Sequence, residues 1–192
     1  MFDAAAAEPD FLVDIQSRCG GNIKTWGEVG LAGEWQTKPI SLYGRNSLSG
    51  TYEFFREIAL NDGDYKDELK QQSDSEGVVR GVTSDKSAIG YSGLGYKTNE
   101  VRTVPLASYD GGKCYDTSAE ATFAGDYPIA RYLYIYLNKK PNEQLDPLRT
   151  EFIKYILSKD GQKQTEMGGY YPITNVIREQ DLKRLGISML TN

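Results

Sequence analysis

The sequence predicts an α/β fold in which a mixed, mostly parallel sheet is flanked by helices. Short apolar or aromatic segments with strand character recur along the chain, at 39–43, 88–91, 101–106 and 128–138. Segments with apolar residues at helical spacing alternate with them. Strands that alternate with helices are typical of sheets whose strands run mainly parallel, because each helix carries the chain back to the starting edge.

The elements of the first half surround a loop rich in glycine and serine. A short helix is expected over 10–18 and a helical turn over 23–30, followed by the strand 39–43. After the loop, residues recur at positions i, i+3, i+4 and i+7, namely Thr51, Phe54, Phe55 and Ile58. This spacing predicts an amphipathic helix that begins near Ser49. A second helix is expected over 75–84.

The second half is expected to contain one central strand and several helices. Residues 128–138 are apolar or aromatic on both faces, which is typical of a strand buried inside a sheet. Asp146 and Pro147 are expected to open a helix, and later helices to end near Gly168 and to cover 175–185. The expected apolar stripe of the Asp146 helix consists of Leu148, Phe152, Tyr155 and Ile156.

Composition and charge exclude several classes of protein. The chain has 192 residues, 39% of them hydrophobic, which is long enough for a domain with its own core. Its net charge of −5 and pI of about 4.9 argue against general binding to nucleic acid or to anionic membranes. Histidine is absent, which excludes Ser-His-Asp and Cys-His catalysis and the commonest zinc ligand. Because the net charge is negative, an anion site in this chain must act locally, through oriented dipoles.

No segment is expected to cross a membrane or to direct export. The longest apolar stretch, 129–137, is interrupted by Arg131 and is far shorter than the ~20 residues that a spanning helix needs. Residues 1–8 lack a basic region followed by an apolar core, so they do not have the pattern of a secretory signal. The two cysteines, Cys19 and Cys114, leave both one disulfide and two separate thiols open.

The loop between the first strand and its helix, 43–51, has the features of an anion site. In an open α/β sheet, ligands bind beyond the carboxyl ends of the strands, where loops meet helix N-termini. There the first backbone N–H groups lack intrahelical partners and the helix dipole is positive. Gly50 lets a ligand approach the backbone closely, and Ser49 and Thr51 offer hydroxyl groups. Arg45 adds a planar fork of donors that can hold two oxygens.

Other interpretations of the same residues are open at this stage. Ser49 would serve equally as the N-cap of its helix, and Arg45 as a partner in a surface ion pair. The loop lacks the lysine of a nucleotide-binding loop, which disfavours nucleotide hydrolysis. A phosphoester or phosphoryl-transfer enzyme would need a metal site or a general base, but the acidic residues of 62–68 have the spacing of a solvated turn.

The segment Arg45 to Thr51, Arg-Asn-Ser-Leu-Ser-Gly-Thr, resembles the phosphate signature of the phosphate-binding proteins of bacterial ABC importers. Further segments resemble landmarks of the same family in the same order along the chain, at 23–27, 88–96, 127–135 and 157–162. The resemblance runs from about residue 13 to residue 185. It implies a type II periplasmic-binding-protein fold, in which two lobes enclose phosphate and deliver it to a membrane permease.

The resemblance carries over four phosphate ligands, which are Arg45, Ser49, Gly50 and Thr51. It implies an N-terminal extension over 1–12 and a phosphate-gripping second lobe over 13–126. Residues 127–192 would be the strand and helices that return to an incomplete first lobe. It also implies a binding protein and not an enzyme, in the periplasm or outside the cell. We expect no cofactor, no metal ion and, from the net charge, no nucleic-acid partner.

The N-terminal part of the family's first lobe, which holds that lobe's own phosphate ligands, has no matching residues in this chain. We therefore expect phosphate binding that is weaker than that of a complete protein, because one side of the cage is absent. We also expect the apolar faces of 132–137 and of the helix around Phe152 to need a cover, either another chain or a swapped second copy. Sulfate is an alternative ligand, since a fully ionised anion needs only donors.

Overall fold

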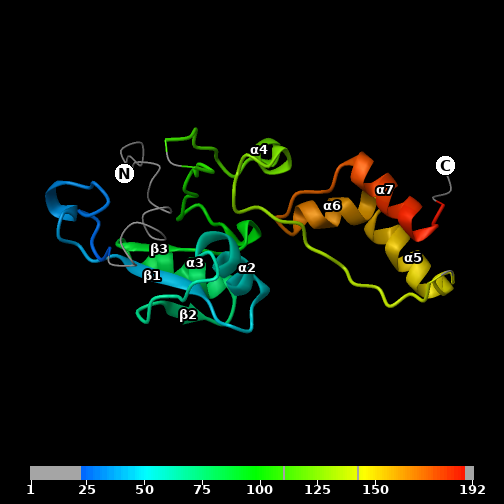
Figure 1. The fold of residues 1–192 in the computed structure, drawn as a ribbon, viewed down its shortest axis with the longest axis horizontal. Coiled ribbons are helices and arrows are strands. Elements are labelled where there is room, and N and C mark those ends of the chain that lie inside the picture. Colours follow the sequence, from blue (N-terminus) through cyan, green and yellow to red (C-terminus); the bar gives the residue numbers. More distant parts are fainter. Residues whose placement is uncertain (1–22, 110, 142, 189–192) are drawn as a thin grey trace. The chain divides into compact units, whose positions relative to one another are not determined.

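The computed structural model describes residues 23–109, 111–141 and 143–188. The chain forms two compact units, of which the first ends at Arg131 and the second begins at Tyr132 (Figure 1). The helix expected over 10–18 lies outside the described residues, as does Cys19. The domain bounds expected from the sequence stay a prediction.

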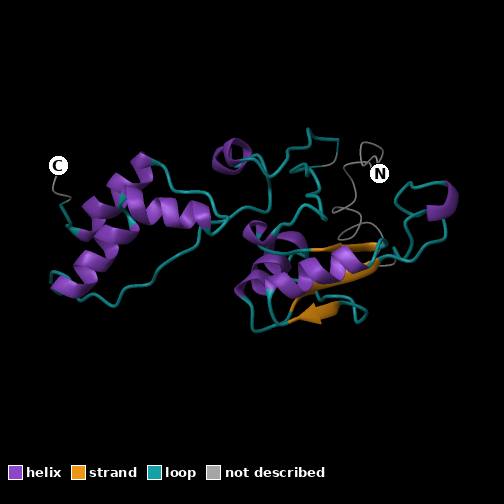
Figure 2. Cartoon of the chain, turned by 180° about the vertical axis from the view of Figure 1, so that it is seen from behind, coloured by secondary structure: helices purple, strands orange, loops and turns teal. Residues whose placement is uncertain are grey.

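The first unit is built on a parallel sheet of three strands (orange in Figure 2). Strand β1 (Ser41–Arg45) lies in the centre, between β2 (Lys70–Gln72) and β3 (Ala88–Gly90). Tyr43 of β1 is paired with Lys70 on one side and with Gly90 on the other. The parallel sheet is thus confirmed, although its first strand begins two residues later than expected.

Helices α2 (Gly50–Ala59) and α3 (Ser75–Ser84) each follow a strand of this sheet. Both begin where the sequence predicts, because polar side chains cap them. Ser49 accepts a hydrogen bond from the first turn of α2, and Asp74 does the same for α3. The two N-termini therefore lie beyond the carboxyl ends of neighbouring strands, which is where parallel sheets bind ligands.

Helix α3 packs against one face of the sheet. A Cβ atom at Gly81 of α3 would overlap the ring of Tyr43, and one at Gly90 of β3 would lie 3.1 Å from a methyl group of Val78. Val78 is the most deeply buried large side chain among the described residues, with 1% of its surface exposed. This close contact between helix and strands forms the core of the first unit.

Aromatic rings cover the opposite face of β1. Gly44 follows Tyr43 and so faces the other side of the sheet, where a Cβ atom would overlap the ring of Tyr91. Tyr91 stacks on Phe55 of α2 with 4.2 Å between the ring centroids, and Tyr65 lies next to both rings. These rings join α2 to the sheet.

The rest of the first unit contains short elements. A turn at 26–30 and the 3-10 helix η3 (Gly33–Trp35) precede β1, while η4 (Leu94–Tyr96) and α4 (Ala119–Ala124) follow β3. The strand expected over 101–106 is wrong. Only Leu106 forms a β-bridge, to Tyr115, because no neighbouring segment among the described residues offers a longer edge.

The second unit contains three helices, α5 (Pro147–Ile156), α6 (Lys159–Met167) and α7 (Asn175–Leu185). Its core consists of Ile153, Leu157 and Leu182. The expected stripe of α5 is therefore wrong in large part, since Leu148, Phe152 and Tyr155 are more than half exposed. Of that stripe, only Ile156 packs on the core. No helix in the described ranges is long and apolar enough to span a bilayer.

The central strand expected over 128–138 is also wrong. These residues form no β-pairing with any described residue. The side chains of Tyr134, Ile135 and Tyr136 are 68%, 54% and 92% exposed. A strand needs an edge to supply its hydrogen bonds, and the described residues do not provide one for this segment. The segment is thus apolar, as expected, but it is neither paired nor buried.

Candidate anion-binding site

The candidate site begins with the tight connection from β1 to α2, the loop 46–49. The Asn46 N–H donates to the Gln72 carbonyl at 3.0 Å, which extends the pairing of β1 with β2 by one residue. The Ser49 N–H then donates to the Asn46 carbonyl at 3.0 Å and closes a turn. Because both ends of the loop are bonded, the entry to α2 is held in a defined position.

Ser49 is the N-cap of α2. Its Oγ accepts a hydrogen bond from the Thr51 N–H at 3.1 Å, and its side chain is buried with 7% of its surface exposed. The capping function weighed in the sequence is therefore real. The Ser49 hydroxyl can still donate a hydrogen bond to a ligand, because it uses only an acceptor position in the cap.

Three backbone N–H groups of the loop have no acceptor among the described residues. They belong to Ser47, Leu48 and Gly50. The N–H groups of Thr51, Tyr52 and Glu53 already donate to Ser49. A helix N-terminus with unpaired N–H groups carries partial positive charge and can accept an anion without rearrangement.

The Arg45 side chain points toward α3. Alternation along β1 places it on the same face as Tyr43, and its guanidinium donates from Nη1 to Ser75 Oγ at 3.0 Å and from Nη2 to the Ser73 carbonyl at 3.1 Å. Its Nε is buried and has no hydrogen-bond partner among the described residues. No hydrogen bond joins this side chain to Ser49, Gly50 or Thr51 in the described part of the chain.

The loop 73–75 is a part of the site that the motif did not reveal. Asp74 caps α3, and a hydrogen bond from the Gly77 N–H, followed by one from the Ser73 hydroxyl, holds the pKa of this carboxyl below its ordinary value. Ser75 is buried with 5% exposed, and its carbonyl accepts from the Ser92 hydroxyl at 3.1 Å. The sequence signal was the capping aspartate before the 75–84 helix.

The hydroxyl groups of two tyrosines, Tyr65 and Tyr91, bond to the backbone of the site. The Tyr91 hydroxyl donates to the Arg45 carbonyl at 3.2 Å, and the Tyr65 hydroxyl donates to the Tyr52 carbonyl at 2.8 Å. Burial raises the pKa of both Tyr65 and Tyr91 above the ordinary range. These hydroxyl groups therefore stay protonated at neutral pH and act as fixed donors.

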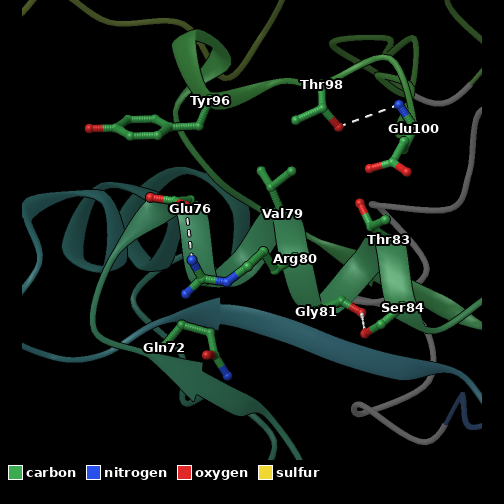
Figure 3. A pocket seen from close by; sticks show the side chains of 11 residues that line it. Gln72, Glu76, Val79, Arg80, Gly81, Thr83, Ser84, Tyr96, Thr98 and Glu100 are labelled. Atoms are coloured by element: carbon green, nitrogen blue, oxygen red, sulfur yellow. Dashed lines mark hydrogen bonds and ion pairs between the residues drawn. The ribbon is translucent and has the colours of Figure 1, made fainter.

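A shallow groove with a volume of about 570 Å³ lies between α3 and the segment 96–100 (Figure 3). Two carboxylates, Glu76 and Glu100, line it, and its Arg80 is paired with Glu76 at 2.8 Å. None of the four predicted phosphate ligands lines this groove. Its carboxylates make it a poor place for an anion, because like charges repel.

The remaining candidate residues do not join the site. Asp62 lies in the acidic turn and pairs with Arg56 at 3.4 Å. Within the described ranges, no three His, Cys, Asp or Glu side chains gather in a way that suits a metal ion. Cys114 is exposed. Its pairing with Cys19 is not tested, because Cys19 lies outside the described residues.

Comparison with known proteins establishes the class of this chain. The family model of the PBP superfamily domain matches residues 19–160, so the chain belongs to the PBP superfamily. The periplasmic-binding-protein fold expected from the sequence is thereby confirmed.

Two curated relatives are both named for phosphate binding. The chain is 44% identical over 180 residues to the phosphate-binding protein PstS of Pseudomonas aeruginosa, and the match covers 93% of this chain and 56% of that protein. It is 30% identical over 175 residues to the phosphate-binding protein PstS of Staphylococcus aureus, covering 87% of this chain and 51% of that protein. The chain thus spans about half the length of these relatives. The resemblance to phosphate-binding proteins is confirmed.

Solved structures agree with this relation. A possible phosphate-binding protein from Planctomyces limnophilus matches with a TM-score of 0.69 and 27% identity, over 96% of this chain and 66% of that one. A structure from Clostridium perfringens, described as a phosphate ABC transporter substrate-binding protein with bound phosphate, matches with a TM-score of 0.60 and 29% identity. That match covers 85% of this chain and 62% of the other.

Proposed function

We propose that this chain binds inorganic phosphate at the N-terminus of α2, with Arg45, Ser49, Gly50 and Thr51 as its ligands. The observation that carries the proposal is a set of unpaired donors at the end of β1. The Gly50 N–H and the buried Nε of Arg45 have no acceptor among the described residues. For the buried Nε of Arg45, the missing acceptor is costly in a folded protein, so a bound oxyanion would relieve that cost. The Gly50 N–H lies on an exposed residue and is accessible to an anion.

The donor types at this site suit phosphate. The Arg45 guanidinium is always charged and directs several N–H groups into one plane, so it can bind two oxygens of a tetrahedral anion at once. The Ser49 and Thr51 hydroxyls can either donate to a phosphate oxygen or accept from a protonated one. This versatility fits an anion that exists in two protonation states near neutral pH.

The function that follows is that of a substrate-binding component of a phosphate ABC importer. The support is the identity of 44% to a protein named for phosphate binding and the likeness to a structure that contains phosphate. On this proposal the chain acts in the periplasm or outside the cell, passes phosphate to a membrane permease, and catalyses no reaction. No contact among the described residues favours a phosphoester enzyme over this function.

Two expectations about partners and affinity stay predictions. The apolar faces of 132–137 and of α5 around Phe152 would be covered by another chain or by a second copy, so light scattering at high concentration should show association. A strictly monomeric species would contradict that expectation. Phosphate affinity should be weaker than about 1 µM, because the described residues offer donors on only one side of the anion.

The test is a titration of the ¹⁵N-labelled chain with phosphate, followed by the amide signals in NMR spectra. We expect saturable shifts that are largest for Ser47, Leu48, Gly50 and Thr51. The N-terminus of α6 serves as the matched control, since Ser158 caps it in the same way but no arginine precedes it. Equal shifts at the two helix ends would show unspecific anion binding and would contradict the proposal.

Sulfate in the same titration decides the ligand. If phosphate is the ligand, sulfate should shift the same amides only at higher concentration, because it offers no proton to the Ser49 and Thr51 hydroxyls at neutral pH. Tighter binding of sulfate would agree with an oxyanion site at α2 but would show that phosphate is the wrong ligand. A submicromolar dissociation constant for phosphate would contradict the expected weak affinity.

A further inference from the structure

We propose that Arg131 is an additional ligand of the bound oxyanion, and that it reaches the first turn of α2 from the last residue of the first unit. This inference rests on the proposed function, because it concerns the same site. In the sequence, Arg131 only interrupts an apolar stretch, and the phosphate signature does not include it.

The guanidinium of Arg131 lies beside the start of α2. Its Cζ is 4.9 Å from the centroid of the Phe54 ring. A Cβ atom built on Gly50 would lie 3.6 Å from its Nη2 and 4.0 Å from its Nη1. Gly50 is the first residue of the helix and carries one of the unpaired N–H groups. The guanidinium is therefore next to the backbone that would hold the anion.

Without an anion, this position is unfavourable for a cation. The N-terminus of a helix carries partial positive charge, and a positive side chain near it is repelled. Within the described part of the chain, no carboxylate forms an ion pair with Arg131, and the stacking on Phe54 is the contact that holds it. An anion at the helix end would reverse the sign of the interaction, because the helix and the guanidinium would both attract it.

The two arginines have different roles on this account. Arg45 is held by two hydrogen bonds at the N-terminus of α3, and its Nε is buried. Arg131 is exposed, and none of its N–H groups donates to a described residue. Since its donors are solvated when the site is empty, Arg131 should contribute less to affinity than Arg45 does.

The test compares phosphate titrations of the whole chain and three variants: Arg131→Gln, Arg131→Lys and Arg102→Gln. The Arg102→Gln variant is the matched control, because it removes the same charge from another exposed arginine of the first unit. We expect Arg131→Gln to raise the dissociation constant about three- to tenfold, Arg131→Lys to restore part of the affinity, and Arg102→Gln to have no effect. Arg131→Gln should also make binding less sensitive to salt.

Each outcome decides the inference. A change in melting temperature with unchanged affinity would show that Arg131 only packs on Phe54, and would overturn the proposal. Equal losses in Arg131→Gln and Arg102→Gln would overturn it too, since net charge alone would then explain the effect. If the unmodified chain binds no phosphate at all, the proposed function and this inference both fail. If the unmodified chain binds phosphate and the Arg131 variants bind it with the same affinity, this inference fails and the proposed function stands.

Discussion

The guanidinium of Arg45 donates to the hydroxyl of Ser75 at 3.0 Å, across a sequence separation of 30 residues. This bond joins the end of the central strand to the first turn of α3. It orients the arginine before any ligand is present. A second hydrogen bond, from Nη2 of Arg45 to the Ser73 carbonyl at 3.1 Å, has the same effect. A side chain that is already oriented loses less conformational freedom when it binds a ligand, so these two hydrogen bonds should raise the affinity for phosphate.

The first prediction concerns this orientation. Ser75→Ala removes the acceptor for Nη1 of Arg45, and we expect the dissociation constant for phosphate to rise about three- to tenfold. Calorimetric titration would measure it. Ser84→Ala is the matched control, because its hydroxyl bonds to the Gly81 carbonyl at the opposite end of the same helix. Unchanged affinity in Ser75→Ala would show that the bond does not position Arg45.

The second prediction separates packing from ligand binding at two glycines. A Cβ atom at Gly44 would overlap the Tyr91 ring, whereas one at Gly50 would meet its nearest neighbour at 3.6 Å, an ordinary contact. Gly44→Ala should therefore lower the free energy of unfolding by about 1–3 kcal/mol. Gly50→Ala should keep stability within about 1 kcal/mol but weaken phosphate binding, since a methyl group hinders approach to the backbone.

Urea denaturation and phosphate titration of both glycine variants would check these outcomes. A large loss of stability in Gly50→Ala would contradict the geometry at the start of α2. Full phosphate affinity in Gly50→Ala would indicate that the anion does not approach this backbone.

The third prediction is a pH dependence that comes from Asp74. Hydrogen bonds from the Gly77 N–H and then the Ser73 hydroxyl hold its pKa below the ordinary value of 3.8. A lowered pKa stabilises the folded state above the unfolded pKa, and this contribution is lost as the pH falls below about 3.8. The free energy of unfolding of the unmodified chain should therefore approach that of Asp74→Asn in this range. Urea denaturation from neutral to acidic pH measures the difference, and a constant gap would contradict the assignment.

The fourth prediction concerns the core of the second unit. Ile153 is 4% exposed and packs with Leu157 and Leu182, while its neighbour Phe152 is 55% exposed. Ile153→Ala should reduce the free energy of unfolding by about 2–4 kcal/mol, because it leaves a cavity. Phe152→Ala should cost less than about 1 kcal/mol. A larger loss for Phe152→Ala would show that this side chain is packed, as the apolar stripe expected from the sequence requires.

Local patterns predicted those elements whose stability is itself local. The bounds of α3 agree with the expected 75–84, because a valine stripe and the capping Asp74 act within the helix. Strand β2 was missed, since Lys70–Gln72 is polar and is held by backbone pairing with β1. The strand expected over 128–138 failed for the opposite reason, because its side chains suit a sheet but no described strand pairs with it.

The candidate site divides in the same way. The helical spacing after Ser49 predicted where α2 begins, and the structure places Ser49 as its N-cap. The direction of Arg45 depends on which face of β1 meets α3, and Ser75 becomes its partner only once β2 pairs with β1. Arg131 reaches the same helix through the tertiary fold alone. No local pattern carries information about such contacts.

The most direct test of the account is a calorimetric phosphate titration of the unmodified chain, of Arg45→Ala and of Arg45→Lys. We expect measurable binding by the unmodified chain and a rise in the dissociation constant of roughly tenfold or more for Arg45→Ala, with the melting temperature nearly unchanged. Arg45→Lys keeps the charge but loses the planar fork, so it should recover only part of the affinity. Equal affinity in Arg45→Ala and the unmodified chain would contradict the central claim that this loop is the phosphate site.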